Sequence, residues 1–152
     1  NIPKDKTLKH SFGMAAGLTT GYGLSYKFEN NGWGVQLTFS PLYRYDYHML
    51  SSGITLSKTI KEGQKNSLFL YTGYHFNYSY GLVYIDSNEY DKTISNIFGG
   101  GYGIRFYFSD RLYFNFMGGI ALCLVERESH PPDPLETIRL LPSGEVGLFY
   151  SF

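Results

Sequence analysis

The sequence lacks features that several large classes of protein need. It holds one cysteine, which excludes an intramolecular disulfide framework and any metal site built from several cysteines. Basic and acidic residues number 13 each, so the zero formal net charge gives no basic footprint for a nucleic acid partner. No apolar run approaches the roughly 18 residues that mark a membrane-spanning helix. Disulfide-rich scaffolds, nucleic-acid-binding proteins and helical membrane proteins are therefore excluded.

What the chain does have is a high content of aromatic rings and little charge. Aromatic residues make up 18 % and charged residues only 17 %, against about 25 % charge in an ordinary globular domain. A hydrophobic share of 43 % is too high for a disordered chain. A length of 152 residues corresponds to a single domain over 1–152, with 1–7 as a short N-terminal segment. The chain starts at Asn1 without an apolar h-region, so we expect any signal peptide to have been removed.

The dominant pattern is an alternation with period two. In the segment 138–152, every second position is mostly large and apolar, and the positions between are mostly small or polar. Successive residues of a strand point to opposite faces of a sheet, so this pattern indicates strands with two different environments. No segment combines a helical period with start and stop signals. We predict eight strands at 8–17, 20–29, 33–44, 49–61, 66–81, 94–108, 111–125 and 138–152.

The predicted connections alternate between short and long. Tight turns fall at 29–32, 62–65 and 109–110, and Asn31-Gly32 is the strongest hairpin signal among them. Longer polar connections fall at 45–48, 82–93 and 126–137. The connection at 18–20 is the only short one on that side. This alternation is typical of antiparallel strands that run up and down in sequence order.

Two kinds of eight-stranded barrel fit the pattern, and they differ in which face is apolar. A soluble lipocalin-like barrel is apolar inside, whereas a membrane barrel is apolar outside and polar in its lumen. Here the polar face carries Gly, Ser, Thr, Asn and Gln rather than the Lys and Glu of a soluble surface. Charges gather in the connections, and rings gather toward strand ends, as in an interfacial girdle. We predict an all-β, eight-stranded antiparallel up-and-down transmembrane β-barrel.

The chain resembles the small eight-stranded outer-membrane barrel proteins of diderm bacteria, with the OmpA/OmpX-type fold. The resemblance rests on the short-turn and long-loop alternation and on the C-terminal segment 146–152, Val-Gly-Leu-Phe-Tyr-Ser-Phe. It implies a location in the bacterial outer membrane of a Gram-negative cell, with both termini in the periplasm and the long loops outside. It also implies contact with membrane lipids, with lipopolysaccharide and with the outer-membrane assembly machinery. The residues implied as the assembly signal are Val146, Leu148, Tyr150 and Phe152.

Several charged and amide side chains share the face that we assign to the lumen. Isolated charges in a narrow interior are costly, so we expect opposite signs to pair. We interpret the set as a polar plug that fills the lumen, with a gate or an ion path as the functional alternative. The predicted lumen network consists of Lys9, Lys27, Gln36, Arg105, Asn115 and Glu145.

Other candidates for chemistry have simpler structural interpretations. His75 and Cys123 lie on the inward face, and the histidines show no metal-ligand spacing. The run 99–103 is rich in glycine but is not followed by a helix, so we interpret it as room for bulky neighbours across the lumen. We predict no cofactor and no metal.

Small outer-membrane barrels that modify lipid A resemble this chain in size, so an enzymatic function is an alternative. The deacylase-type barrels place a His and a Ser two apart on one strand face, whereas Ser129 and His130 are adjacent here. The palmitoyltransferase-type barrels carry an amphipathic N-terminal helix, but the first ten residues contain Pro3 and no apolar stripe. We predict a non-enzymatic structural or anchoring protein with loops for partner binding, alone or as a subunit of a larger outer-membrane complex. The alternatives are a lipid A-modifying enzyme and a narrow channel.

Overall fold

The computed structural model describes residues 8–44, 47–82, 90–129 and 135–152. The N-terminal segment expected at 1–7 lies outside the described residues. Among the described residues, no helix has the length and apolar character that crossing a membrane requires. The strands are β1 (Lys9–Gly17), β2 (Gly21–Asn30), β3 (Trp33–Arg44), β4 (Tyr47–Glu62), β5 (Asn66–Leu82), β6 (Tyr90–Tyr107), β7 (Leu112–Ser129) and β8 (Leu135–Ser151).

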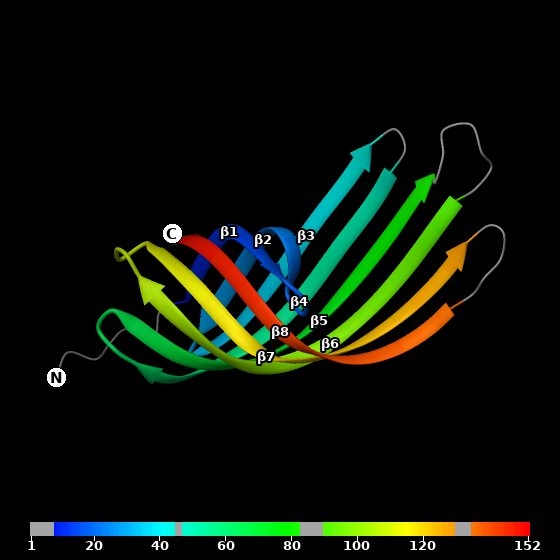
Figure 1. Ribbon diagram of the computed structural model, residues 1–152. Helices are drawn as coiled ribbons and strands as arrows, with labels where there is room; N and C mark the ends of the chain where they lie inside the picture. The colour runs from blue at the N-terminus through cyan, green and yellow to red at the C-terminus, as the bar shows by residue number, and fades with distance from the viewer. Residues whose placement is uncertain (1–7, 45–46, 83–89, 130–134) are drawn as a thin grey trace.

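The eight strands form a closed barrel in sequence order, as the sequence predicts. Each strand pairs antiparallel with the next, and β1 closes the ring on β8 from Ser11↔Ser151 to Gly17↔Glu145. β1 begins and β8 ends at the same end of the barrel, which also carries the tight turns (Figure 1). The hairpin between β2 and β3 turns at Asn31 and Gly32, with φ of 52° and 75°. Positive φ at both turn positions matches the strand twist, so the Asn-Gly prediction is confirmed.

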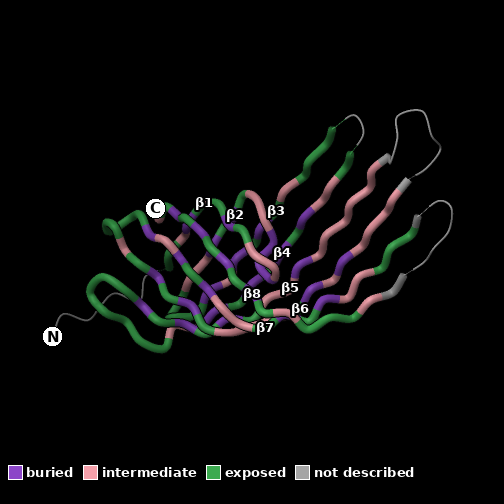
Figure 2. The backbone as a smooth tube through the Cα atoms, viewed as in Figure 1, coloured by how far each residue is buried: buried purple, intermediate pink, exposed green. Residues whose placement is uncertain are grey.

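The two faces of the wall have opposite polarity. Burial alternates along the strands (Figure 2), with apolar side chains exposed on the outside. Met14 is 65 % exposed, Ile120 58 % and Leu140 69 %, whereas Lys27 is 1 % exposed and Gln36 3 %. The interior therefore holds the polar side chains, and the predicted direction of the two faces is confirmed.

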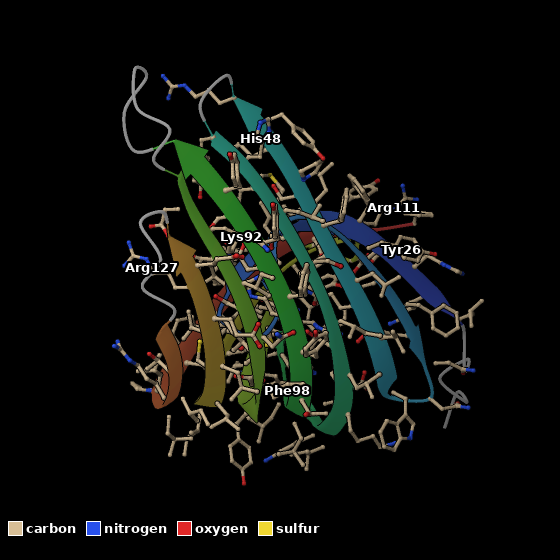
Figure 3. All side chains as sticks on the ribbon, turned by 90° about the vertical axis from the view of Figure 1, so that its right-hand side faces the viewer. Tyr26, His48, Lys92, Phe98, Arg111 and Arg127 are labelled. Atoms are coloured by element: carbon tan, nitrogen blue, oxygen red, sulfur yellow. The ribbon has the colours of Figure 1, made fainter. Side chains whose placement is uncertain are left out.

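The strands at the end away from the termini are longer than the sequence predicts. The connections expected at 82–93 and 126–137 are shorter, because β5 runs to Leu82, β6 starts at Tyr90, β7 runs to Ser129 and β8 starts at Leu135. Charges that we interpreted as loop residues pair across strands instead. Arg127 donates to Asp91 with Nη2 2.5 Å from Oδ2, and Lys92 Nζ lies 3.0 Å from Glu128 Oε2. Lys92 and Arg127, labelled in Figure 3, lie near the start of β6 and near the end of β7, at the end of the barrel away from the termini.

The connection between β1 and β2 folds into the barrel. β1 and β2 are the shortest strands, and the side chains of Thr19 and Thr20 between them are fully buried. Glycines on the facing strands leave the space: a Cβ at Gly53 would lie 2.0 Å from the Thr20 carbonyl oxygen, and one at Gly99 would lie 2.5 Å from Thr19 Cγ2. The 18–20 turn therefore forms a floor across the lumen, below the far ends of β3 to β8.

We predict that Gly53→Val displaces this floor. Its side chain would overlap the Thr20 carbonyl, and overpacking of this kind costs about 1–3 kcal/mol. The matched control is Gly118→Val, because a Cβ at Gly118 meets only the Ser143 carbonyl oxygen at 3.9 Å. Urea unfolding of detergent-folded protein should show a lower midpoint for the first variant only. Equal midpoints for both variants would contradict the close approach of Gly53 to the turn.

Candidate functional site

The most concentrated group of functional side chains is a buried cluster of three charges near the end that carries the termini. The guanidinium of Arg105 on β6 forms a bidentate ion pair with Glu29 on β2. Nη1 lies 3.0 Å from Oε2, and Nη2 lies 2.5 Å from Oε1. Lys27 Nζ lies 3.2 Å from the same Glu29 Oε1. All three side chains are nearly inaccessible, at 2 %, 12 % and 6 % exposed for Lys27, Glu29 and Arg105. A carboxylate thus bridges two cations inside the ring.

Aromatic side chains enclose the cluster. The Arg105 guanidinium lies 4.7 Å from the Tyr113 ring centre, and Lys27 Nζ lies 5.4 Å from that of Phe69. Tyr113 in turn stacks on Phe149 with ring centres 5.4 Å apart. Gly103 makes room for Phe69, because a Cβ there would lie 2.3 Å from the Phe69 ring. Attraction between cations and ring faces compensates part of the hydration that the buried cations lose.

The structure brings some of the predicted lumen residues into this cluster and leaves others apart. Asn115 accepts a hydrogen bond from Arg105 Nε at 3.2 Å. Gln36 is buried beside Lys27 in the register and donates to Thr38 Oγ1 at 3.3 Å. Glu145 is buried under the 18–20 turn, where it accepts a hydrogen bond from Thr19.

Lys9 lies apart from these buried residues. It is exposed at the mouth of the barrel, where it lines a cavity of about 340 Å³ together with Glu29 and Arg105. Lys9 is thus on the inward side of β1 but outside the buried cluster. Among the residues that the structure describes, the charges inside the barrel are therefore Lys27 and Arg105 against Glu29 and Glu145.

Glu29 is the central residue that the sequence interpretation missed. The prediction assigns Glu29 both to the end of the strand 20–29 and to the turn 29–32, and leaves it out of the lumen network; in the structure β2 continues to Asn30, so Glu29 is a strand residue. It shares the inward face of β2 with Lys27, two positions away. Continuing the period-two pattern from Ser25 and Lys27 would have identified it.

A second polar group holds the 18–20 turn in place. His75 lies 2.9 Å from the Leu18 carbonyl oxygen through Nδ1 and 2.9 Å from Ser51 Oγ through Nε2. The Leu18 carbonyl can only accept, so Nδ1 carries the proton and the Ser51 hydroxyl donates to Nε2. Both side chains are buried, at 2 % exposed for His75 and 0 % for Ser51. The pair is a clamp between β4, β5 and the turn.

This arrangement does not present a reactive group to a substrate. The Ser51 oxygen is inaccessible and also accepts the Tyr22 backbone N–H at 3.3 Å. Within the described ranges, no group of three or more His, Cys, Asp or Glu side chains could hold a metal ion. Cys123 is buried against Ile97 and Ala121. His130 lies outside the described residues, as does the side chain of Ser129. The described polar groups can fill space, fix the register and pair charges.

We predict that Glu29→Gln destabilises the barrel far more than Lys27→Met. Removing the carboxylate leaves two buried cations without their shared partner, and breaking a buried ion pair costs roughly 3–5 kcal/mol. Removing Lys27 leaves the Arg105–Glu29 pair intact and neutral. The measurement is urea unfolding of both variants in the same detergent. Equal losses in the two variants would show that Glu29 does not act as the bridge.

Comparisons with known proteins identify the fold. No protein-family model and no curated protein sequence matches the chain. Among solved structures, it is similar to the crystal structure of the N-terminal β-barrel domain of Pseudomonas aeruginosa OprF, with a TM-score of 0.54 and 12 % sequence identity. The match covers 95 % of this chain and 98 % of that one. The chain therefore has the eight-stranded barrel fold of the OmpA type.

Proposed function

We propose that the chain is a non-enzymatic, integral β-barrel of the bacterial outer membrane. The polarity of its wall is the observation that carries this proposal, because a ring of exposed apolar side chains surrounds a polar, charged interior. Monomeric soluble proteins rarely expose contiguous apolar surfaces of this extent. In hydrocarbon, a closed barrel is also one of the two backbone arrangements that satisfy their own hydrogen bonds.

Aromatic side chains at both ends of the apolar surface support a membrane position. At the end with the tight turns, Lys58 Nζ lies over the exposed Trp33 ring, 4.7 Å from its centre. At the opposite end, His48 packs between Tyr43 and Tyr80 with ring centres 5.5 and 6.4 Å away. Rings with one wet and one apolar side are favoured at membrane interfaces. The two groups would mark the two boundaries of the bilayer.

The short turns and both termini would then lie in the periplasm, and the longer connections would face outside. Val146, Leu148 and Tyr150 point outward from β8, and Phe152 follows at the end of the strand, 72 % exposed. They would be accessible as the signal for the assembly machinery. Membrane lipids and lipopolysaccharide would contact the apolar belt, and other outer-membrane proteins could dock on the loops.

The lumen contents favour an anchor over a narrow channel. Phe69, Met117 and Tyr71 form one buried cluster, and the Glu29 ion pairs lie beside Phe69. No observation favours the lipid A-modifying alternative, since the described serine–histidine pair is buried inside the wall. We infer a plugged barrel that anchors and presents its loops.

A charged substitution on the outer face tests the membrane proposal. Leu122 on β7 is 40 % exposed and points outward. Leu122→Arg should cost about 2–4 kcal/mol near the bilayer midplane, whereas Leu112→Arg at the end of the same strand should cost about 0–1 kcal/mol. Folding equilibria in phospholipid vesicles measure both values. A Leu122→Arg cost no larger than the Leu112→Arg cost would refute the lipid-facing position of this wall.

A lumen filled by side chains predicts a protein that conducts no ions. Wild-type protein in a planar bilayer should show no discrete conductance steps, because side chains fill the lumen. The conductance of the wild type is compared with that of Glu29→Ala, a variant that lacks the carboxylate between the two cations. Regular conductance steps from the wild-type protein would reject the plug and favour the channel.

A further inference from the structure

The wall of the barrel is incomplete above the β1–β2 hairpin. β1 pairs with β8 only as far as Gly17↔Glu145, and β2 pairs with β3 only as far as Leu24↔Phe39. Beyond these positions, residues 135–144 of β8 and 40–44 of β3 have a neighbour on one side alone among the described residues. Two strand edges therefore border an opening over the 18–20 turn, at the level where β3 to β8 continue past the hairpin (Figure 1).

Prolines occur on the same two edges. Pro41 of β3 pairs with Leu50, and Pro142 of β8 pairs with Ile120, so each has its partner on the side away from the opening. They are the only prolines within the described ranges. Proline cannot donate to a ladder, which confines it to edge strands. A proline on an edge strand also hinders that edge from pairing with a strand of another chain.

A cavity crosses the wall at this opening. It has a volume of about 450 Å³, within the roughly 300–1,000 Å³ of small-molecule sites. Ala16 and Gly144 line its mouth from the outward-facing positions of β1 and β8, whereas Ile97 and His75 line it from the inward-facing positions of β6 and β5. Leu18 links the cavity to an apolar cluster that includes Cys123. The cavity thus joins the outer apolar surface to the lumen above the turn.

The geometry points to a binding site for one acyl chain of a membrane lipid, entering sideways between β8 and the β1–β2 hairpin. This inference rests on the proposed membrane location. The exposed apolar belt continues up to the opening, where Ile138 and Leu140 on β8 are 73 % and 69 % exposed. A lipid chain that lies against this belt therefore reaches the mouth of the cavity without crossing a polar surface.

An acyl chain fits the opening better than an added peptide strand. A strand binds an edge through main-chain hydrogen bonds, which the two prolines weaken. An acyl chain needs no hydrogen bonds. In the cavity it can pack against Ala16, Leu18 and Ile97, beside the polar lining residues Tyr22, His75, Asn77 and Ser95. The 18–20 turn, fixed by the His75 and Ser51 clamp, closes the cavity toward the charged cluster below. The chain would therefore end at the turn.

Gly144 offers a way to close the opening without disturbing the fold. A Cβ at Gly144 meets no atom within 4 Å, so Gly144→Phe should be accommodated and fill the mouth of the cavity. Gly118 is the matched control, because it is the register partner of Gly144 on β7 and a Cβ there meets only the Ser143 carbonyl oxygen, at 3.9 Å. Gly118 does not line the cavity. Retained heat-dependent mobility on SDS gels would show that both variants fold.

The experiment uses the full chain folded into phosphatidylethanolamine–phosphatidylglycerol vesicles that contain a phosphatidylcholine with a diazirine at the acyl end. Cross-linked residues are mapped by mass spectrometry after irradiation. We expect label on inward-facing Leu18, Ile97 and Asn77 in the wild type and in Gly118→Phe, and its loss in Gly144→Phe. Label on outward-facing residues such as Leu122 and Leu148 should persist in all three proteins.

The outcomes separate this inference from the proposed function. Outward label without inward label in the wild type would overturn the acyl site while supporting the membrane position, and would leave the opening to a protein segment. Inward label that is unchanged in Gly144→Phe would also overturn it, because the chain would not enter at Gly144. Absence of outward label would instead reject the membrane location itself.

Discussion

Backbone hydrogen bonding around a closed ring is the constraint on which this structure depends. A strand that faces hydrocarbon has no water to satisfy its N–H and C=O groups, so each edge needs a neighbour. The seam of β1 on β8 meets this need over a short stretch, from the hydrogen bond of Phe152 N–H to the His10 carbonyl up to the pair Gly17↔Glu145. The rest of the molecule follows from that short seam: a complete barrel toward the termini, and an open wall where β3 to β8 continue alone.

The short hairpin also determines how the lumen is divided. Its turn bends inward and is fixed by His75 and Ser51, with glycines at Gly53 and Gly99 leaving the space. Below the turn, the bidentate Arg105–Glu29 pair and its aromatic surroundings fill the interior. Above it, the cavity at Ala16 and Gly144 opens sideways. One structural element thus separates the charged cluster on one side from the cavity at Ala16 and Gly144 on the other.

This division reconciles two demands that small barrels face. Buried charges are costly unless they are paired, and here Glu29 pairs with both Lys27 and Arg105, whereas Glu145 accepts a hydrogen bond from Thr19. An opening in the wall is also costly where it faces hydrocarbon, because backbone groups on its two strand edges have no strand neighbour there. The prolines at positions 41 and 142 fall on the two edges where a missing donor breaks no ladder bond.

The sequence by itself determined the number of strands, their order and which face is apolar. Alternation such as Leu140, Val146 and Leu148 against Ser143 and Glu145 reports the face of each residue directly, because side chains alternate across a strand. The inward positions of Lys27, Arg105 and Asn115 followed in the same way. Strand ends near Asp91 and Arg127 were misjudged, since charge that suggests a loop also pairs across neighbouring strands.

Only the tertiary structure decided which inward residues meet. Glu29 and Arg105 lie on β2 and β6, and their pairing depends on how the strands are staggered when the ring closes. The entry of the 18–20 turn into the lumen, and the opening beside Gly144, depend on the same stagger. Period-two alternation predicts which face of the wall each side chain occupies, but not its position along the barrel axis. That axial position decides which side chains of distant strands come into contact.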